Sequence, residues 1–267
     1  MTPPEFFYGW DSTLGAELDR GRRQLAGLCH RASVAVADSE FNARDLAELK
    51  PARVEVIPVL TDDALLPVDG PPAPRAVRDR SAPTVLFVGR LAPNKCQHDL
   101  LAAMAVLRQR IPGAELVLVG SSSAERYEQS LREFAAELGI ADSVRFEGSV
   151  SATDLGSWYR SADVFVCLSE HEGFCVPILE AMAWGLPVIA FDAAAVPDTV
   201  AGAGVVLEDK SAGVVASAIE RVVSDELLRQ HLVELGSARA EELRASVVRP
   251  RFRDFFLELL KSGEIRR

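Results

Sequence analysis

The chain has 267 residues, of which 48% are hydrophobic and 25% are charged, a composition typical of a globular protein with a core of its own. Its formal net charge of -10 argues against a general nucleic-acid-binding or anionic-membrane surface, because attraction to phosphates needs clustered lysine and arginine. No nucleic-acid partner is therefore expected, and an anionic ligand must be held locally by a few well-placed cations.

Cysteine and histidine spacing gives no sign of a metal site. The four cysteines form no CxxC pair and the four histidines form no HExxH or HxxxH pattern, and unpaired thiols fit a reducing compartment. The N-terminus lacks the basic and apolar regions of a signal peptide. The longest mostly apolar stretch, Val176 to Phe191, is too short and too interrupted to span a bilayer. We expect a cytoplasmic chain with at most peripheral membrane contact.

Residues 1–62 are expected to form a small α/β segment. Its helices and strands follow from apolar spacing and from an Asp38-Ser39 cap, and they are expected at Thr13–Arg31, Ala32–Ala37, Glu40–Leu49 and Arg53–Val59. Residues 63–82 are rich in proline, aspartate and glycine and show little periodicity, which is typical of an interdomain linker.

Beyond the linker, strands and helices alternate regularly through residues 83–250, and a C-terminal helix is expected in residues 251–267, near Arg251–Leu260. The expected strands are Thr84–Gly89, Ala114–Gly120, Val144–Glu147, Val164–Leu168, Val188–Phe191 and Gly204–Leu207. The expected helices are Lys95–Arg110, Ala124–Leu138, Ala152–Ser161, Val176–Trp184, Ala212–Val223 and Glu226–Leu243. Continuously apolar strands such as VLFVG predict an α/β domain whose parallel sheet has helices on both faces. Ligands bind such sheets at the carboxyl ends of the strands.

The loop GRLAPNK, which follows the first strand of this domain, offers two cations for a phosphate. Arg90 provides a fork of donors at the end of the strand, and Lys95 adds a point charge at the start of the next helix. No GxGxxG, GxxxxGK or DxD motif occurs, so these side chains would neutralise a diphosphate without a metal clamp. The alternative is that both cations are simply solvated.

The sequence EHEGFCVPILEAMAWG follows the strand VFVCLS and holds two carboxylates with distinct settings. Pro177 suits the first turn of a helix and Gly185 suits its C-terminal cap, which places Glu180 on a largely buried helix. A buried carboxylate needs hydrogen-bond donors, and two ribose hydroxyls would supply them. An internal arginine or the helix's own N-terminus is the alternative partner. Glu172, in the preceding loop, is either a sugar-binding acid or an exposed loop acid.

These stretches resemble the family 4 glycosyltransferases of the GT-B fold. The matching segments include FVGRLAPNK, ELVLVGSSS, VRFEGSVSATDL, YRSADVFVCLSEHEGFCVPILEAMAWGLPVIAFD and GAGVVL, with the two glutamates in the family's Glu-x7-Glu spacing. The resemblance implies that residues 83–250 bind a nucleotide-diphosphate sugar. It assigns the diphosphate to Arg90 and Lys95, the transferred sugar to Glu172, and the ribose to Glu180. The backbone at Gly173, Phe174 and Cys175 is assigned to the distal phosphate.

The resemblance also implies a reaction. A hexose would pass from a GDP-mannose or UDP-glucose type of donor to a glycan or lipid-linked acceptor, with retention of configuration and with neither metal nor cofactor. Arg90, Lys95 and Glu172 would be the catalytic groups. Cys175 stands where the family most often has glycine, a departure that narrows the sugar pocket. Gly120, Gly148 and Val150 are weak candidates for lining the base pocket.

A larger departure concerns residues 1–62, which resemble only the end of the family's acceptor-binding domain. We expect this fragment to expose an unpaired strand edge and an apolar face. The expectation is an N-terminally shortened enzyme that needs an acceptor-domain partner or a second copy of itself. The alternative is a non-catalytic nucleotide-sugar-binding subunit that docks on a separate acceptor-binding chain. A GT-B epimerase or phosphorylase is a third interpretation.

Overall fold

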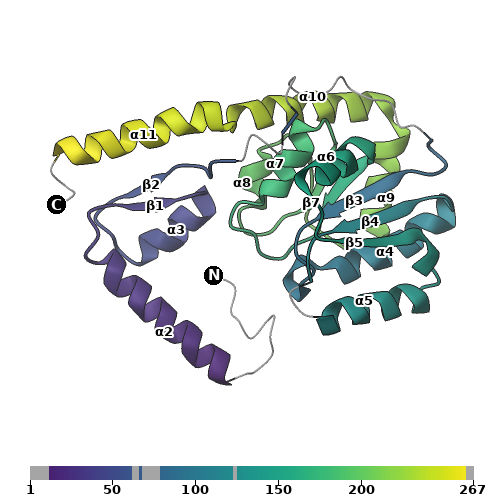
Figure 1. Cartoon of the computed structure of the whole chain (residues 1–267), viewed down its shortest axis with the longest axis horizontal. Helices are drawn as coiled ribbons and strands as arrows, with labels where there is room; N and C mark the ends of the chain where they lie inside the picture. Colours follow the sequence, from purple (N-terminus) through teal and green to yellow (C-terminus); the bar gives the residue numbers. More distant parts are fainter. Residues whose placement is uncertain (1–11, 62–65, 68–78, 123–124, 263–267) are drawn as a thin grey trace. The chain divides into compact units, whose positions relative to one another are not determined.

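A computed structural model of the chain describes residues 12–61, 66–67, 79–122 and 125–262 (Figure 1). The chain forms two compact units, which we describe separately. The larger unit comprises residues 62–243, and the smaller unit combines residues 1–61 with residues 244–267. The linker expected at residues 63–82 lies largely outside the described residues.

The larger unit is built on a six-stranded parallel sheet with the strand order β5-β4-β3-β6-β7-β8. Its strands are β3 (Thr84–Val88), β4 (Glu115–Val119), β5 (Val144–Gly148), β6 (Val164–Cys167), β7 (Val188–Phe191) and β8 (Val205–Leu207). All six lie within about a residue of the expected positions, and the predicted parallel sheet is confirmed.

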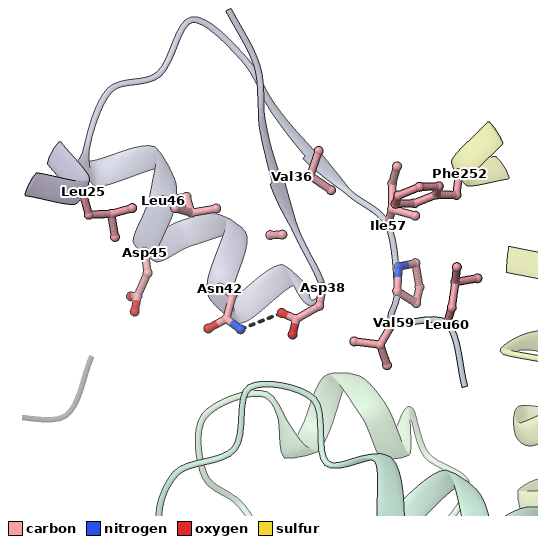
Figure 2. A pocket seen from close by; sticks show the side chains of 12 residues that line it. Leu25, Val36, Asp38, Asn42, Asp45, Leu46, Ile57, Val59, Leu60 and Phe252 are labelled. Carbon is pink, nitrogen blue, oxygen red and sulfur yellow. Dashed lines mark hydrogen bonds between the residues drawn. The ribbon is translucent and has the colours of Figure 1, made fainter. Parts of the chain in front are cut away.

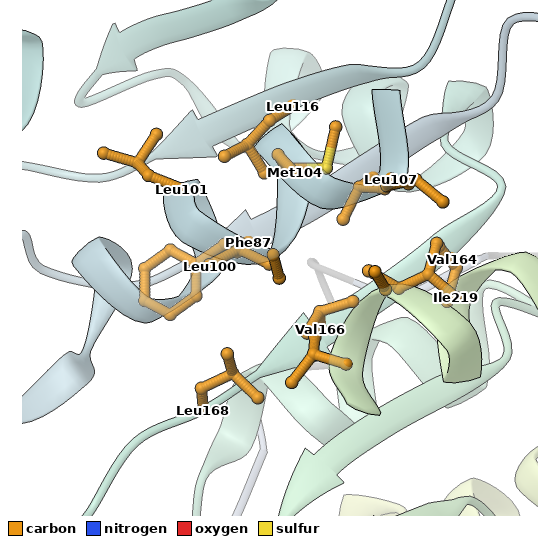
Figure 3. Close-up of a cluster of buried hydrophobic side chains, with 14 of the residues drawn as sticks. Phe87, Leu100, Leu101, Met104, Leu107, Leu116, Val164, Val166, Leu168 and Ile219 are labelled. Carbon is orange, nitrogen blue, oxygen red and sulfur yellow. The ribbon is translucent and has the colours of Figure 1, made fainter. Parts of the chain in front are cut away.

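Helices cover both faces of this sheet (Figure 1). They are η2 (Pro93–Lys95), α4 (Gln97–Arg110), α5 (Glu125–Glu137), η3 (Ala141–Ser143), α6 (Ala152–Ser161), α7 (Val176–Ala183), α8 (Val196–Val200), α9 (Ala212–Ser224) and α10 (Glu226–Glu242). Val164 and Val166 of β6 pack with α4 and α9 in the main apolar cluster (Figure 3), while the neighbouring Phe165 contacts Tyr159 of α6. Burial on both faces explains why the strands are continuously apolar.

Two helices of the larger unit differ from the sequence-based expectation. The helix expected from Lys95 begins only at Gln97, because Cys96 adopts a left-handed conformation (φ 53°) that separates the short turn η2 from α4. Lys95 therefore closes a 3-10 turn rather than opening a long helix. The five-residue helix α8 is absent from the sequence-based expectation, since it is too short to show helical periodicity.

The smaller unit contains α2 (Ser12–Cys29), β1 (Ala35–Ala37), α3 (Glu40–Glu48), β2 (Val54–Val56) and α11 (Ala245–Ser262). The predicted cap of α3 is confirmed, because Ser39 Oγ accepts a hydrogen bond from Asn42 N at 3.2 Å. The C-terminal helix begins at Ala245 rather than near 251 and carries Pro250 inside it, although proline is unfavourable in a helix interior. Its buried residues Val248, Phe255 and Leu259 pack against Ile57, so the end of the chain completes the core of this unit.

The smaller unit also exposes apolar surface. Among the described residues, β1 and β2 pair only with each other, as a two-stranded parallel sheet, which confirms the expected unpaired edge. A pocket of about 710 Å³ lies beside this sheet (Figure 2). Its lining is mainly apolar, and its polar side chains are Asp38, Asn42 and Asp45. Asn42 Nδ2 donates to Asp38 Oδ1 at 2.6 Å. None of the described helices is long and apolar enough to cross a membrane.

Candidate functional site

The strand order reverses its direction between the two central strands of the large sheet, β3 and β6. The chain leaves β3 toward β4 and β5, but it leaves β6 toward β7 and β8 on the opposite side. Loops that diverge in this way open the sheet at its carboxyl edge, which is where open α/β sheets bind ligands. Arg90 and Lys95 follow β3, whereas Glu172 follows β6, so the topology brings the two predicted loops to the same place.

An ion pair joins these loops directly. Lys95 Nζ donates to Glu172 Oε1 at 2.6 Å, and the two side chains are only 15% and 12% exposed. A backbone bond from Glu170 N to Asn94 O, 3.0 Å long, reinforces the junction. The structure thus brings together two of the predicted site residues that are 77 positions apart in the sequence. Glu172 is neither fully exposed nor solitary, contrary to the alternative of an exposed loop acid.

Arg90 lies at the same edge but remains exposed and outside this ion pair. A hydrogen bond fixes its backbone, because the buried side chain of Gln97 donates from Nε2 to Arg90 O at 3.0 Å. Gly120 of the neighbouring loop approaches so closely that a Cβ there would lie 2.1 Å from Gly89 O. The loop after β3 therefore has a fixed backbone that presents an exposed cationic side chain.

Glu180 is buried in α7, with 6% of its surface exposed, and it has a hydrogen-bond partner that is absent from the sequence-based candidates. Tyr159 Oη of α6 donates to Glu180 Oε2 at 2.7 Å. The pKa of Tyr159 is held well above its ordinary value, mainly by burial and next by the carboxylate of Glu180, so the phenol keeps its proton. The sequence signal for Tyr159 is weak, because a tyrosine in an amphipathic helix usually serves packing.

The loop between Glu172 and α7 is fixed by its backbone. Cys175 has φ 64° and ψ 65°, in the left-handed region that favours glycine, which accounts for the glycine most common here in the resembling family. The carbonyl of Phe174 accepts a bond from Thr199 Oγ1, and Glu172 O accepts one from Ala195 N at 3.2 Å. The unpredicted helix α8 and the residue before it thus support the predicted loop.

The two ends of α7 follow the prediction. Pro177 lies in its first turn. At the other end, Gly185 has φ 71° and donates to Met182 O, and Leu186 N donates to Ala181 O at 2.9 Å. These two bonds form a Schellman motif, which satisfies carbonyls that would otherwise end the helix unpaired. The position of Glu180 is therefore set by a helix with well-defined ends.

A third cation, Lys210, reaches the site from the loop after β8 and is absent from the sequence-based candidates. Its Nζ lies 2.6 Å from Glu170 Oε1, 2.9 Å from Asp99 Oδ2 and 3.3 Å from Cys96 Sγ. Although burial opposes the charged form, the bonds to Glu170 and Asp99 raise the pKa of Lys210 above its ordinary value. Burial raises the pKa of Cys96 to about 11 despite this cation. Lys210 belongs to a segment without a recognisable motif, so its place beside the site is seen only in the folded chain.

Two of the weak base-pocket candidates contact each other at the carboxyl edge. Gly120 N donates to Gly148 O at 2.8 Å, which joins the ends of β4 and β5, and Val150 follows as a half-buried residue. Two groups of side chains among the described residues have metal-ligand atoms within 4.8 Å of one another. They are Cys167, Glu172 and Cys175, and Cys96, His98 and Asp99.

The fold and this edge of the sheet match known proteins. The family model described as "Glycosyl transferases group 1" matches residues 74–239, which is more than half of the chain. The chain belongs to this glycosyltransferase family. The match spans both loops of the site, and it confirms the family resemblance and the GT-B class of fold.

Relatives and solved structures agree with this membership. A GDP-mannose-dependent alpha-(1-6)-phosphatidylinositol monomannoside mannosyltransferase of Mycobacterium tuberculosis is 36% identical over 172 residues, which cover 61% of this chain and 43% of the relative. A sucrose-phosphate synthase structure from Thermosynechococcus elongatus is 25% identical with a TM-score of 0.77, covering 90% of this chain and 62% of that one. Anabaena HepE in complex with UDP-glucose is 22% identical with a TM-score of 0.76, covering 89% and 67%. The chain thus spans less than half the length of the curated relative.

Proposed function

We propose that this chain is the donor-binding part of a retaining, metal-independent glycosyltransferase that transfers a hexose from a GDP-mannose or UDP-glucose type of donor to a glycan or lipid-linked acceptor. The observation that carries the proposal is the partly buried ion pair between Lys95 and Glu172 at the point where the strand order reverses. A sugar diphosphate placed there meets a cation for its phosphate and a carboxylate for its hydroxyls.

Each group has a distinct task in this proposal. Lys95 carries three N–H donors, so it can keep Glu172 oriented while another donor turns to a phosphate oxygen. Arg90 adds a second cation, and both stabilise the negative charge that grows on the departing nucleoside diphosphate. Glu172 accepts hydrogen bonds from the transferred sugar. Glu180, already oriented by Tyr159, accepts them from the ribose. The family resemblance supports same-face attack, which retains the anomeric configuration.

The nature of donor and acceptor rests on the relatives. The mannosyltransferase of M. tuberculosis is named for GDP-mannose and for a phosphatidylinositol acceptor, which supports a guanine nucleotide and a lipid-linked acceptor. The HepE structure contains UDP-glucose, which supports the uridine alternative. The loops described above supply two cationic side chains, Arg90 and Lys95, that can neutralise the diphosphate. The proposed mechanism therefore needs no divalent cation to hold it.

Calorimetric titration with UDP, GDP and their sugar conjugates in a metal chelator tests the proposal. We expect one of the two nucleotide series to bind, and we expect Arg90→Ala and Glu180→Ala each to weaken that binding by more than about tenfold, which is about 1.4 kcal/mol. Arg249→Ala is the matched control, because Arg249 is an exposed arginine of the smaller unit. Binding that is unaffected by both site variants, or that appears only when metal is added, would contradict the proposal.

A further inference from the structure

Two cysteines whose thiols have no role in the proposed chemistry lie at the two ends of the donor loop. Cys167 ends β6 and Cys175 caps α7, and their sulfur atoms are 3.8 Å apart. Glu172 Oε1 lies 4.0 Å from Cys167 Sγ, and all three ligand atoms lie within 4.8 Å of one another. The backbone holds this arrangement, since Cys167 belongs to a buried strand and Cys175 has a left-handed backbone conformation at the N-cap of α7.

The spacing matches a tetrahedral metal site. Two thiolates bound to one zinc ion at about 2.3 Å lie about 3.8 Å from each other, and a thiolate and a carboxylate oxygen lie about 3.6 Å apart. The observed separations need only small side-chain adjustments to reach these values. From these contacts we infer that Cys167, Glu172 and Cys175 form a binding site for a thiolate-preferring divalent cation of the zinc class.

Charge balance favours such an ion even though the site is nearly buried. Before binding, Glu172 carries one negative charge and Lys95 one positive charge, while the two cysteines are thiols. The divalent ion replaces the two thiol protons, which are released to solvent, so the net charge of the cluster does not change.

The second candidate cluster is less suited to a cation. Cys96, His98 and Asp99 also bring ligand atoms together, but Lys210 Nζ already lies 2.9 Å from Asp99 Oδ2 and 3.3 Å from Cys96 Sγ. An ammonium in that position repels a metal ion, and burial raises the pKa of Cys96 to about 11, which opposes formation of its thiolate. Cys96 therefore provides a matched control for the two cysteines of the inferred site.

A consequence for the donor follows, and this consequence rests on the proposed function. A metal ion that occupies Glu172 removes the carboxylate that would receive the sugar, and it locks the loop that would receive the distal phosphate. Zinc-class ions should therefore compete with the nucleotide sugar rather than assist it. A divalent cation of the oxygen-preferring class, such as magnesium, should have no such effect because it does not select thiolates.

Cadmium titration of the full chain, kept reduced with a non-thiol reductant, tests the site. We expect thiolate-to-cadmium charge-transfer absorption that saturates at one ion per chain and an apparent affinity that rises with pH. Cys167→Ala and Cys175→Ala should each halve the absorption and weaken binding by more than about tenfold, the loss that even outer-shell substitutions at metal sites can cause. Cys96→Ala should change neither. Near-ultraviolet circular dichroism verifies that each variant is folded.

The outcomes separate the two proposals. No charge-transfer band from the folded chain, or a band that survives in Cys167→Ala and Cys175→Ala, overturns the metal site. Titration of UDP- and GDP-sugars with and without bound cadmium then examines the competition. Cadmium binding that leaves donor affinity unchanged keeps the metal site but refutes the competition. Donor binding without any cadmium binding leaves the proposed function intact and refutes this inference.

Discussion

Among single residues, the two glutamates of the loop and helix are in different environments although they are eight positions apart. Glu172 is partly buried in the loop after β6 and is held by a lysine ammonium, whereas Glu180 is buried in α7 and accepts a hydrogen bond from a phenol. The first carboxylate can exchange partners when a ligand arrives. The second is fixed in one orientation. Substitutions around Glu180 should therefore affect stability and donor affinity, whereas substitutions around Glu172 should affect turnover.

Tyr159→Phe should reduce both stability and donor affinity. The variant keeps the ring in the core but removes the 2.7 Å hydrogen bond to the charged Glu180, a type of bond that contributes about 1.5–3 kcal/mol. Urea unfolding should show a loss of about this size, and calorimetry should show weaker nucleotide binding. Tyr127→Phe is the control, because the Tyr127 hydroxyl lies 3.1 Å from Nδ1 of the exposed His98 rather than beside a buried carboxylate. Equal losses in the two variants would contradict a special contribution from the bond to Glu180.

Lys95→Met should impair turnover more than it impairs folding. The variant keeps the aliphatic stem but removes the charge that balances Glu172 and that would face the leaving diphosphate. We expect the rate of nucleoside-diphosphate release from the donor to fall about 10²–10³-fold, as for the loss of one preorganised transition-state donor. Lys261→Met, at an exposed lysine in the last turn of α11, should not change the rate. A similar loss in both variants would argue against a specific role for Lys95.

Among the secondary-structure elements, the site depends on how closely the loops after β3 and β4 approach each other. Gly120 has φ 140°, and a Cβ at this position would lie 2.1 Å from Gly89 O and 2.7 Å from Gly89 C. Both atoms belong to the backbone, so the clash cannot be relieved by a side-chain rotation. The bond from Gly120 N to Gly148 O connects the same loop to the end of β5.

Gly120→Ala should therefore separate the loops and displace the backbone that presents Arg90. We expect a loss of more than about 2 kcal/mol in the free energy of unfolding, together with weaker nucleotide binding. Gly139→Ala is the control, since Gly139 also has a positive φ (69°), but a Cβ at that position would meet no neighbouring atom within 4 Å. The control should lose only about 1–2 kcal/mol from backbone strain and should bind nucleotide normally. Urea unfolding and calorimetry distinguish the two.

For the molecule as a whole, buried acidic protons couple stability to pH. Burial raises the pKa of Cys96 to about 11 from its ordinary 9.0, and burial also raises the pKa values of Tyr127 and Tyr159. Above pH 9 the unfolded chain loses the Cys96 proton while the folded chain still holds it. The folded state then binds more protons than the unfolded state, so its stability falls as pH rises.

Alkaline titration of stability should show this loss. The free energy of unfolding should be constant with respect to Cys96 below about pH 9 and should fall by about 1.4 kcal/mol per pH unit between about pH 9 and 11. Cys96→Ala should remove this part of the decline, and the tyrosines should add theirs above about pH 10. The midpoint of urea unfolding at several pH values measures the effect. An identical decline in Cys96→Ala would contradict the assignment to this thiol.

Local sequence is sufficient to define the strands of the larger unit, most of its helices and the class of its fold. Continuously apolar strands between amphipathic helices permit little else than a parallel sheet covered on both faces, and Pro177 and Gly185 mark the ends of α7 because their backbone preferences are local. The choice of Arg90, Lys95, Glu172 and Glu180 also follows from the sequence, since the loops that end parallel strands are where ligands bind.

The tertiary structure decides which side chains of the site contact one another. The bond of Tyr159 to Glu180, the reach of Lys210 to Glu170 and the approach of Cys167 to Cys175 join segments whose distances in space depend on strand order and helix packing. The start of α4 at Gln97 and the helical Pro250 likewise reflect contacts that outweigh local preferences. Propensity acts over a few neighbouring residues, whereas burial and hydrogen bonding reward partners from anywhere in the chain, and for this reason the partners of each site residue appear only in the folded molecule.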